Sequence, residues 1–276
     1  MFDISKLISL ISILFILNIS ACASTTNNKI ERFNFPTESF VQIQTKLYTL
    51  SCTPSDPDDK TSNCRELIES ATGSGAIIAR SVDGSYILTA GHLCNRKDNF
   101  ENFNKMMGRS LDQPIIEEYV AKDIDMFDYN VEILDYDVEQ DVCLAYAWGL
   151  LAPALEIAEK APEIGEKVYN MAAPAGYMMA GAVPLFEGYY FGKGPDYDLY
   201  TVPAIGGSSG SPIVNSNGQL VGMIYARHTH FHHITISPVH KKMVSFILEG
   251  MKKDANRRNK IHNVPRGKGL KINISY

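Results

Sequence analysis

Apolar and polar residues alternate along several short stretches of the chain, with the period of two that is typical of half-buried β-strands. Residues 40–48 show it clearly, and turn residues such as Asp83-Gly84 separate neighbouring apolar runs, as in β-hairpins. A second hairpin is indicated where Asn215–Gly218 divides the runs 212–214 and 219–224. The pattern predicts further strands at 72–79, 115–121, 129–134, 184–191 and 197–202.

One segment near the end of the chain has a helical period instead. Ser237 and Pro238 are residues that favour the start of a helix, as N-cap and first helical residue. The apolar stripe that follows consists of Val239, Met243, Phe246 and Ile247. We expect a helix here, and an insertion or short helix in the polar stretch 95–113.

The first 23 residues are typical of a secretory signal. Lys6 precedes the apolar run 7–17, which is too short to span a bilayer comfortably. The sequence 19–22, which ends at Cys22, resembles a bacterial lipobox, in which the cysteine is lipidated; ordinary cleavage at Ala21–Ala23 is the alternative. A lipidated Cys22 would anchor the protein to a membrane, so we expect a periplasmic or cell-surface lipoprotein, or else a secreted protein. Residues 24–38 are polar and unpatterned, as in a tether.

Composition and charge change this picture little. The 276 residues are 45% hydrophobic and 21% charged, as is ordinary for a globular protein. The net charge of −5 is uneven: residues 251–276 hold eight Lys or Arg and one Asp, a net of +7, which leaves −12 for residues 1–250. We expect 251–276 to be a solvated basic tail, with contact to anionic lipid or another polyanion as the alternative. Nothing indicates sequence-specific nucleic-acid recognition.

The strongest candidate for chemistry is the stretch 204–214, where small hydroxyl residues lie among glycines. Glycine permits positive φ and lets a substrate carbonyl approach backbone amides that can stabilise an oxyanion. A simple Gly/Ser turn between strands is the alternative. The pattern Gly-x-Ser-x-Gly at 206–210 also matches a nucleophile elbow, but that motif needs a helix after the serine, and the residues after it predict a hairpin.

In another frame, Gly207-Ser208-Ser209-Gly210-Ser211-Pro212 resembles the G-x-S-G-[GS]-P signature of chymotrypsin-like serine proteases. Two upstream segments resemble the other motifs of that family in the same order. Thr89-Ala90-Gly91-His92 is similar to its "TAGH" element, and Asp141-Val142-Cys143-Leu144-Ala145 to its aspartate strand. Residues 72–79 and 164–176 are similar to segments of bacterial Htr-type members. The chain is thus identified as trypsin-like, closest to Htr-type and glutamyl-endopeptidase-like domains.

The resemblance implies an all-β fold of two six-stranded antiparallel β-barrels with a C-terminal helix packed on the second barrel. It covers residues 39–250, with barrel one at about 39–148 and barrel two at about 152–250. It also implies a triad of Ser209 as nucleophile, His92 as base and Asp141 as its orienting partner, with oxyanion donors at the backbone of Gly207 and Ser209.

Specificity residues follow from the same resemblance. Thr201, Pro203 and Ile205 would line the primary pocket, and the strand Tyr225-Ala226-Arg227 would pair with the substrate backbone. Pro203 stands where trypsin has an acid, so we expect a small or medium apolar residue before the scissile bond. Tyr225 replaces a small hydroxyl residue that usually supports the aspartate.

Four cysteines remain if Cys22 is removed or lipidated, and export makes them candidates for disulfides. Four cysteines allow three pairings, which the sequence does not distinguish. We favour Cys52–Cys64, which closes a polar loop, and Cys94–Cys143, because these two follow His92 and Asp141 by two residues each. Buried free thiols are the alternative for the second pair.

No cofactor or metal is expected. The segment His228-Thr229-His230-Phe231-His232-His233 invites a metal interpretation, because alternation would place three imidazoles on one side. We favour the interpretation that this segment is a solvent-exposed hairpin tip. A third interpretation is that one of the imidazoles binds an acidic group of the substrate.

The function that these observations favour is a serine endopeptidase acting on polypeptides. The alternative is a binding module of low turnover on the same scaffold. An esterase would need the excluded elbow and a Ser–Asp–His order, which only Asp254 and His262 in the basic tail could supply. The oligomeric state is left open.

Overall fold

The computed structural model describes residues 34–50, 65–109 and 113–262. From Phe35 onward the chain forms one compact unit. The predicted signal, Cys22, Cys52, Cys64 and the end of the basic tail lie outside the described residues. In the described part of the chain, no helix is long and apolar enough to cross a membrane.

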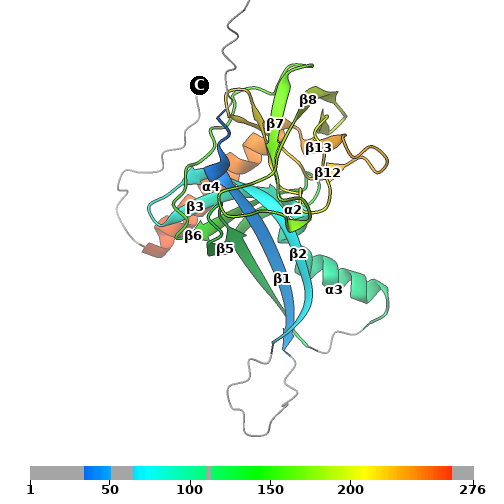
Figure 1. Ribbon diagram of the computed structural model, residues 1–276. Coiled ribbons are helices and arrows are strands. Elements are labelled where there is room, and N and C mark those ends of the chain that lie inside the picture. The colour runs from blue at the N-terminus through cyan, green and yellow to red at the C-terminus, as the bar shows by residue number, and fades with distance from the viewer. Residues whose placement is uncertain (1–33, 51–64, 110–112, 263–276) are drawn as a thin grey trace, which may run out of the picture. The chain divides into compact units, whose positions relative to one another are not determined.

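Six strands of the first half form a closed antiparallel barrel in the order β1-β2-β3-β6-β5-β4 (Figure 1). Their bounds are β1 Phe40–Leu50, β2 Arg65–Arg80, β3 Gly84–Ala90, β4 Ile115–Lys122, β5 Asp128–Asp137 and β6 Val142–Trp148. Every residue of β3 is buried, and Tyr86 of this strand is hydrogen-bonded to Asp254 of the C-terminal helix. The first predicted barrel is therefore confirmed.

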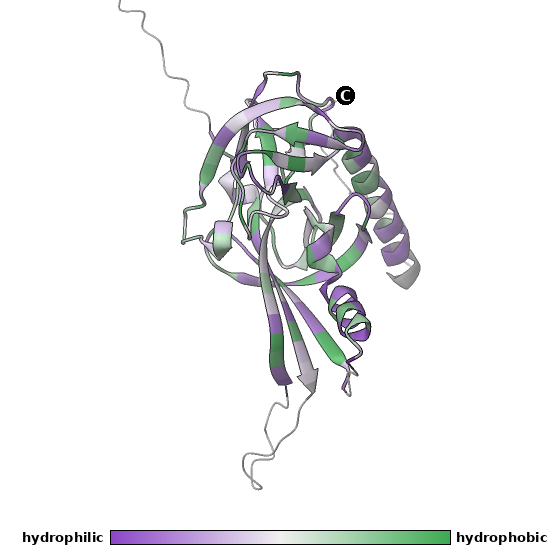
Figure 2. Cartoon of the chain, turned by 90° about the vertical axis from the view of Figure 1, so that its right-hand side faces the viewer, coloured by the Kyte–Doolittle hydropathy of each residue, from purple (hydrophilic) through white to green (hydrophobic). Residues whose placement is uncertain are grey.

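Short helices interrupt or extend the first half. They are the 3₁₀ turn η2 (Thr37–Ser39), α2 (Gly91–Cys94) and α3 (Arg96–Met106). The predicted insertion after His92 thus contains a helix, which lies beside the extension formed by β1, β2 and β4 (Figures 1 and 2).

The second half differs from the predicted barrel. It is an open seven-stranded sheet in the order β11-β10-β7-β8-β9-β13-β12. Its elements are β7 Lys167–Met171, η3 Pro174–Gly176, β8 Leu185–Lys193, β9 Tyr197–Tyr200, β10 Pro212–Asn215, β11 Leu220–Met223, β12 Ala226–Arg227 and β13 Thr235–Pro238. The two edge strands β11 and β12 follow each other in the chain, separated by Ile224 and Tyr225. The backbone itself therefore connects the edges, and in the part of the chain that the structure describes no hydrogen-bonded ladder closes this sheet.

A shared apolar cluster packs the two halves together. Phe40 of β1 belongs to one buried cluster with Met171 and Ala173 of the second half. Each half also has its own core: Ile77, Ile87 and Ala145 belong to that of the barrel. Burial of such side chains contributes about 25 cal/mol per Å² of apolar surface to stability.

The C-terminal helix α4 runs from His240 to His262, so the prediction of a solvated basic tail from residue 251 is wrong for this part. Met251 and Asp254 are buried, because α4 contacts β5 and β6 of the barrel as well as β11 and β13. The predicted apolar stripe is present, with Met243 and Ile247 fully buried. Figure 2 shows hydrophobic and hydrophilic positions alternating along α4.

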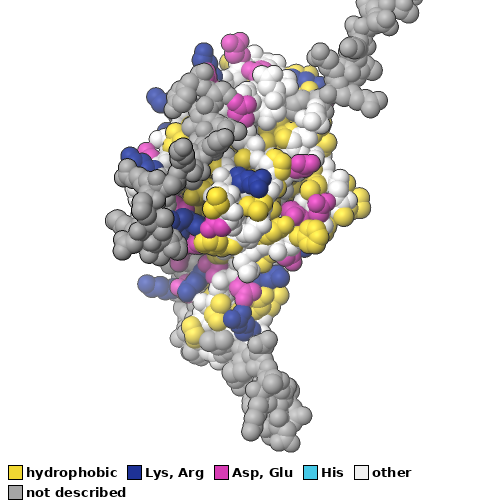
Figure 3. Space-filling model, turned by 90° about the vertical axis from the view of Figure 1, so that its left-hand side faces the viewer, with side chains coloured by type: hydrophobic (Ala, Val, Ile, Leu, Met, Phe, Trp, Pro, Cys, Tyr) yellow, Lys and Arg dark blue, Asp and Glu magenta, His cyan; other side chains and the backbone are white. Residues whose placement is uncertain are grey.

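The start of α4 also differs from the expectation. Ser237 and Pro238 belong to β13, and the backbone N–H of His240 donates instead to the carboxylate of Asp198 in β9, at 2.8 Å. A buried carboxylate at a helix N-terminus satisfies a backbone donor and interacts favourably with the helix dipole. On the surface, hydrophobic, acidic and basic side chains are interspersed, as Figure 3 shows for one face.

Candidate active site

His92 and Asp141 are in direct contact. His92 Nδ1 lies 2.8 Å from Asp141 Oδ2 and 3.1 Å from Oδ1, and the His92 backbone N–H donates to Oδ1 at 2.6 Å. A carboxylate only accepts hydrogen bonds, so Nδ1 carries the hydrogen and the neutral ring keeps Nε2 as a base. The contact therefore fixes both the orientation and the tautomer of the imidazole.

Local sequence explains how this contact forms. His92 follows Gly91, where a Cβ would lie only 2.9 Å from the backbone nitrogen of Val142. Glycine thus lets α2 approach the start of β6. Asp141 has φ of +50°, a left-handed conformation that Asp tolerates better than most residues.

The turn before Asp141 is held by Asp137. Its carboxylate accepts hydrogen bonds from the backbone of Glu139 and Gln140 and from the Gln140 side chain, each at 2.9 Å. Asp137 is therefore a structural residue of the turn, and Asp141 is the carboxylate in contact with histidine.

Ser209 lies on a turn that exposes it in part, whereas its neighbour Ser208 is 1% exposed. Ser208 Oγ accepts a hydrogen bond from the Ile205 backbone at 3.3 Å, so its hydroxyl is engaged within the loop. Ser211 N donates to Ser208 O at 3.0 Å, and Gly210 has φ of +87°, as in a type II turn. Of the two serines, Ser209 has the accessibility that a nucleophile needs.

The turn before it also has type II geometry. Ser208 N donates to Ile205 O at 3.0 Å, and Gly207, with φ of +92°, occupies the position that requires a positive φ. A Cβ at Gly207 would lie 2.5 Å from the Ala173 carbonyl oxygen, so only glycine fits there. The two successive turns together carry the backbone N–H groups of Gly207 and Ser209 that the sequence predicts as oxyanion donors.

The first barrel brings Ser209 next to the histidine segment. Ser74 N of β2 donates to Ser209 O at 2.7 Å, and a Cβ at Gly210 would lie 3.1 Å from the Ala90 backbone nitrogen. Ala90 precedes His92 by two residues. Among the described residues, no hydrogen bond joins His92 to Ser209; such bonds are often long before substrate binds.

Residues 73–223 match the sequence model of the trypsin-like peptidase domain, which is more than half of the chain. The chain belongs to the trypsin-like peptidase family. A comparison with curated proteins finds no match.

Two solved structures share the fold of this peptidase domain. One is the serine endoprotease from Yersinia pestis, with a TM-score of 0.53 and 16% identity over 79% of this chain and 64% of that chain. The other is the HtrA-type protease AlgW with decapeptide, with a TM-score of 0.56 and 16% identity over 78% of this chain and 65% of that chain. The chain thus spans about two thirds of the length of each.

The predicted specificity residues of the peptidase domain lie around the nucleophile loop. Exposure alternates along this segment. Thr201 and Pro203 are half-buried and Ile205 is exposed, whereas Val202 and Ala204 are buried. Ala226 and Arg227 form β12, which is an edge strand of the second sheet. Tyr225 is close enough to Asp141 that burial, together with the carboxylate charge, raises the pKa of the phenol.

The Cys94–Cys143 disulfide is confirmed, with a Cα–Cα distance of 6.4 Å. It joins α2 to β6 beside the His92–Asp141 contact. The favoured Cys52–Cys64 pair lies outside the described residues.

The histidine segment is the exposed tip of the β12–β13 hairpin, so the favoured interpretation is confirmed. The extended alternation of imidazoles on which the metal alternative depends is not present. His228 Nδ1 accepts hydrogen bonds from the backbone of His230 and Phe231, at 3.2 and 3.3 Å. No three His, Cys, Asp or Glu side chains in the described ranges are placed to hold a metal ion.

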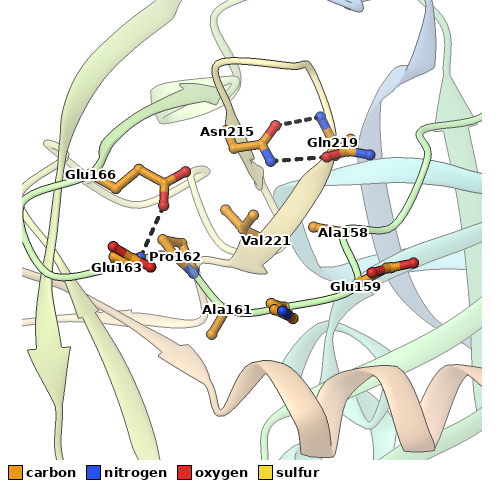
Figure 4. A pocket seen from close by; sticks show the side chains of 10 residues that line it. Ala158, Glu159, Ala161, Pro162, Glu163, Glu166, Asn215, Gln219 and Val221 are labelled. Carbon is orange, nitrogen blue, oxygen red and sulfur yellow. Dashed lines mark hydrogen bonds between the residues drawn. The ribbon is translucent and has the colours of Figure 1, made fainter. Parts of the chain in front are cut away.

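A separate pocket lies on the second half of the domain, with a volume of about 370 Å³ (Figure 4). The segment 158–163, Glu166 and the β10–β11 turn line it, and Asn215 and Gln219 are hydrogen-bonded at its rim. Neither His92, Asp141 nor Ser209 contributes to this pocket.

Sequence reasoning missed the residues that support the oxyanion turn. Ala175 N donates to Gly206 O at 2.6 Å, and Ser74 Oγ donates to Gly207 O at 2.8 Å. The Gly-Ser-Gly sequence at 73–75 was the available signal, but it indicated a strand and gave no role to the hydroxyl of Ser74.

Proposed function

We propose that the protein is a serine endopeptidase that cleaves polypeptides through an acyl-enzyme. The observation that carries the proposal is the His92–Asp141 contact beside the partly exposed Ser209, in a member of the trypsin-like peptidase family. In the first step, His92 Nε2 takes the proton of Ser209 Oγ as that oxygen attacks the scissile carbonyl carbon. The proton then passes to the leaving amine as the C–N bond breaks. In the second step His92 takes a proton from a water molecule that attacks the acyl-enzyme, and returns it to Ser209 Oγ as the ester bond breaks.

The oxyanion of the tetrahedral intermediate would bind to the N–H groups of Gly207 and Ser209. A preorganised donor of this kind lowers the barrier by about 2.7–4 kcal/mol. Asp141 stabilises the imidazolium form of His92 while it holds the proton.

The substrate backbone would add to the free edge of β12. β-Augmentation needs an extended edge strand beside the nucleophile. Ala226–Arg227 is an edge strand among the described residues, and Ile224, two residues before it, accepts a hydrogen bond from the Gly210 backbone. For the residue before the scissile bond we propose a small or medium apolar side chain, because Pro203 brings no charge to the predicted pocket wall. A peptide library cleaved by the protein tests this preference, and a strong preference for Lys, Arg or Glu would contradict it.

The test of the activity is labelling with a fluorophosphonate probe. We expect one adduct on the wild type, located at Ser209 by mass spectrometry, and none on Ser209→Ala. Ser208→Ala is the matched control, and we expect it to be labelled. An unlabelled but folded wild type would instead favour the binding module of low turnover.

We also propose export, with Cys22 as a lipidated anchor. The Cys94–Cys143 disulfide supports an oxidising compartment. Growth of expressing cells with an alkyne-tagged fatty acid should label the wild type and not Cys22→Ser. Labelling of neither protein, with both recovered as shorter secreted chains, would indicate ordinary signal cleavage.

A further inference from the structure

Gln42 and Ser74 are a buried polar pair where the barrel meets the nucleophile loop. They face each other directly in the antiparallel register of β1 and β2. Gln42 is 4% exposed and Ser74 is fully buried. Polar side chains at such positions need hydrogen-bond partners, and both of these side chains find partners in the second half.

The Ser74 hydroxyl uses both its donor and its acceptor. Oγ donates to the Gly207 carbonyl at 2.8 Å and accepts from the Ala173 N–H at 2.9 Å. One hydroxyl therefore connects the oxyanion turn to the segment just before η3. The Ser74 backbone N–H also holds the carbonyl of Ser209.

The Gln42 amide holds the other end of η3. Nε2 donates to the Gly176 carbonyl at 2.7 Å, while Gln42 Oε1 accepts from Gln44 Nε2 at 3.1 Å, which orients the amide. Gln42 and Ser74 thus fix η3 at its two ends, Gly176 and Ala173.

Between these ends, Ala175 N donates to the Gly206 carbonyl at 2.6 Å. In a trans peptide the C=O and N–H point in opposite directions, so this bond directs the Gly207 N–H away from η3. Rotation of the Gly206–Gly207 peptide would break the bond to Ala175. The same donor is the one predicted to bind the oxyanion.

Ala175 itself has φ of +52°, a conformation that is unfavourable for a residue with a Cβ. Such strain persists only where the surroundings over-determine the backbone. The hydrogen bonds from Gln42 and Ser74 on either side of Ala175 supply that constraint.

We propose that Gln42 and Ser74 are positioning residues that keep the Gly207 N–H in its oxyanion-binding orientation in the free protein. This inference rests on the proposed peptidase function. Neither side chain is placed to touch the reacting atoms; both act through η3 and the Gly206–Gly207 peptide. The site is then ready for substrate without an activating ligand.

The test compares Ser74→Ala with Ser85→Ala. Both remove a buried serine hydroxyl of the first barrel that donates to a backbone carbonyl, but the Ser85 partner is Leu150, away from η3 and the nucleophile loop. The readouts are the second-order rate of fluorophosphonate labelling, the thermal midpoint, and kcat and KM on a peptide found by library cleavage.

We expect Ser74→Ala to lower the labelling rate and kcat at least about tenfold, part of the loss of about 10²–10³ that follows removal of an oxyanion donor. KM should stay nearly constant, because the oxyanion exists only in the transition state. Ser85→Ala should lower the thermal midpoint without this loss of kcat. Equal labelling rates for the two variants, or losses that simply follow the thermal midpoint, would overturn the proposal.

Gln42→Met provides a second variant if Ser74→Ala does not fold, because it removes the bond to Gly176 and the bond from Gln44 but leaves those of Ser74 in place. We expect the same selective loss of kcat, smaller in size, and an unchanged rate would again reject the pair as positioning residues. Failure of the peptidase function is distinct from either result, since the wild type itself would then remain unlabelled.

Discussion

The carboxylate of Asp254 in α4 accepts a 2.9 Å hydrogen bond from the Tyr86 hydroxyl in β3, across 168 residues of sequence. Arg257 and Arg258 also donate to it, and Asp254 is 3% exposed. The Arg258 guanidinium in turn lies over the rings of Tyr146 and Trp148, at 4.0 and 4.7 Å. This cluster joins the last described turns of α4 to the barrel.

Asp254→Ala should strongly destabilise the fold. The change leaves the Tyr86 hydroxyl and the Arg258 guanidinium without their buried partner, and breaking such a buried pair costs about 3–5 kcal/mol. Urea unfolding measures the loss. Lys253→Ala is the control, because its ion pair with Asp135 is exposed and should contribute little; similar losses for both variants would contradict the role of Asp254.

Acid should weaken the fold in two stages. Burial lowers the pKa of His240, and His240 Nε2 has no hydrogen-bond partner among the described residues. A lowered folded pKa means that the unfolded chain binds the proton more readily, so stability falls as the pH drops below about 6.5, the ordinary value for histidine. His240→Gln should remove this stage in urea unfolding measured against pH.

The second stage belongs to Asp254. Burial raises the pKa of this carboxyl, but the hydrogen bonds from Arg257, Arg258 and Tyr86 outweigh burial and hold the pKa below its ordinary value. Its contribution is therefore complete above about pH 4 and is lost as the pH falls further. This stage should persist in His240→Gln, and its absence there would show that other groups control acid unfolding.

Gly210→Ala should abolish labelling by a fluorophosphonate. A Cβ at this position would lie 2.0 Å from the Ser74 carbonyl oxygen and 2.3 Å from Thr89 Oγ1, so the nucleophile turn must move. Gly218→Ala is matched in backbone conformation, with φ of +77°, but its Cβ would meet nothing within 4 Å. It should lose about 1–2 kcal/mol of stability and keep its labelling rate.

Replacement of both Cys94 and Cys143 by Ala should lower stability by up to about 4 kcal/mol, the chain-entropy value for a loop of this length. The disulfide has a sequence separation of 49 and joins the segments that carry His92 and Asp141. We therefore expect the double variant to lose labelling at temperatures where the wild type is active. Reductant should produce this shift in the thermal unfolding of the wild type, and it should shift the variant less, because the Cys94–Cys143 bond is already absent there.

Asp141→Asn should reduce kcat by about 10⁴ if Asp141 sets the imidazole tautomer, as in the trypsin-like mechanism. An amide can donate to Nδ1 and so stabilise the wrong tautomer. Asp137→Asn serves as the control, because Asp137 only accepts hydrogen bonds within its turn. Equal losses of kcat for the two variants would reject the assignment of Asp141.

Local patterns predicted the parts of the fold that depend on local chemistry. Alternation and turn residues located β1, β4 and β8, and the motif around His92 placed it directly after a buried strand. The Cys94–Cys143 pair could be predicted because the two cysteines have equal offsets from residues that must meet. These features need no knowledge of distant partners.

The errors arose where distant partners decide the structure. Residues 251–258 were predicted as a solvated tail from their charge, yet Arg257 pairs with Glu132 and Lys253 with Asp135 in β5. Likewise, no local pattern indicates that Asp198 caps α4, or that Ser74 reaches across to Gly207. Periodicity also does not reveal that β11 and β12, which Ile224 and Tyr225 connect, are not paired with each other.

Helix α4 begins against Asp198 in the second half and reaches Tyr86 in the first, so it ties the two halves together. The residues Asp254–Arg258 of α4, which contact the barrel, come after all the described strands in the sequence and are therefore synthesised after them. Each half can therefore complete its own strand pairing while the chain is still being made. The apolar cluster around Phe40 and the hydrogen bonds of Ser74 already join the halves, and the last helical turns add the final set of contacts between them.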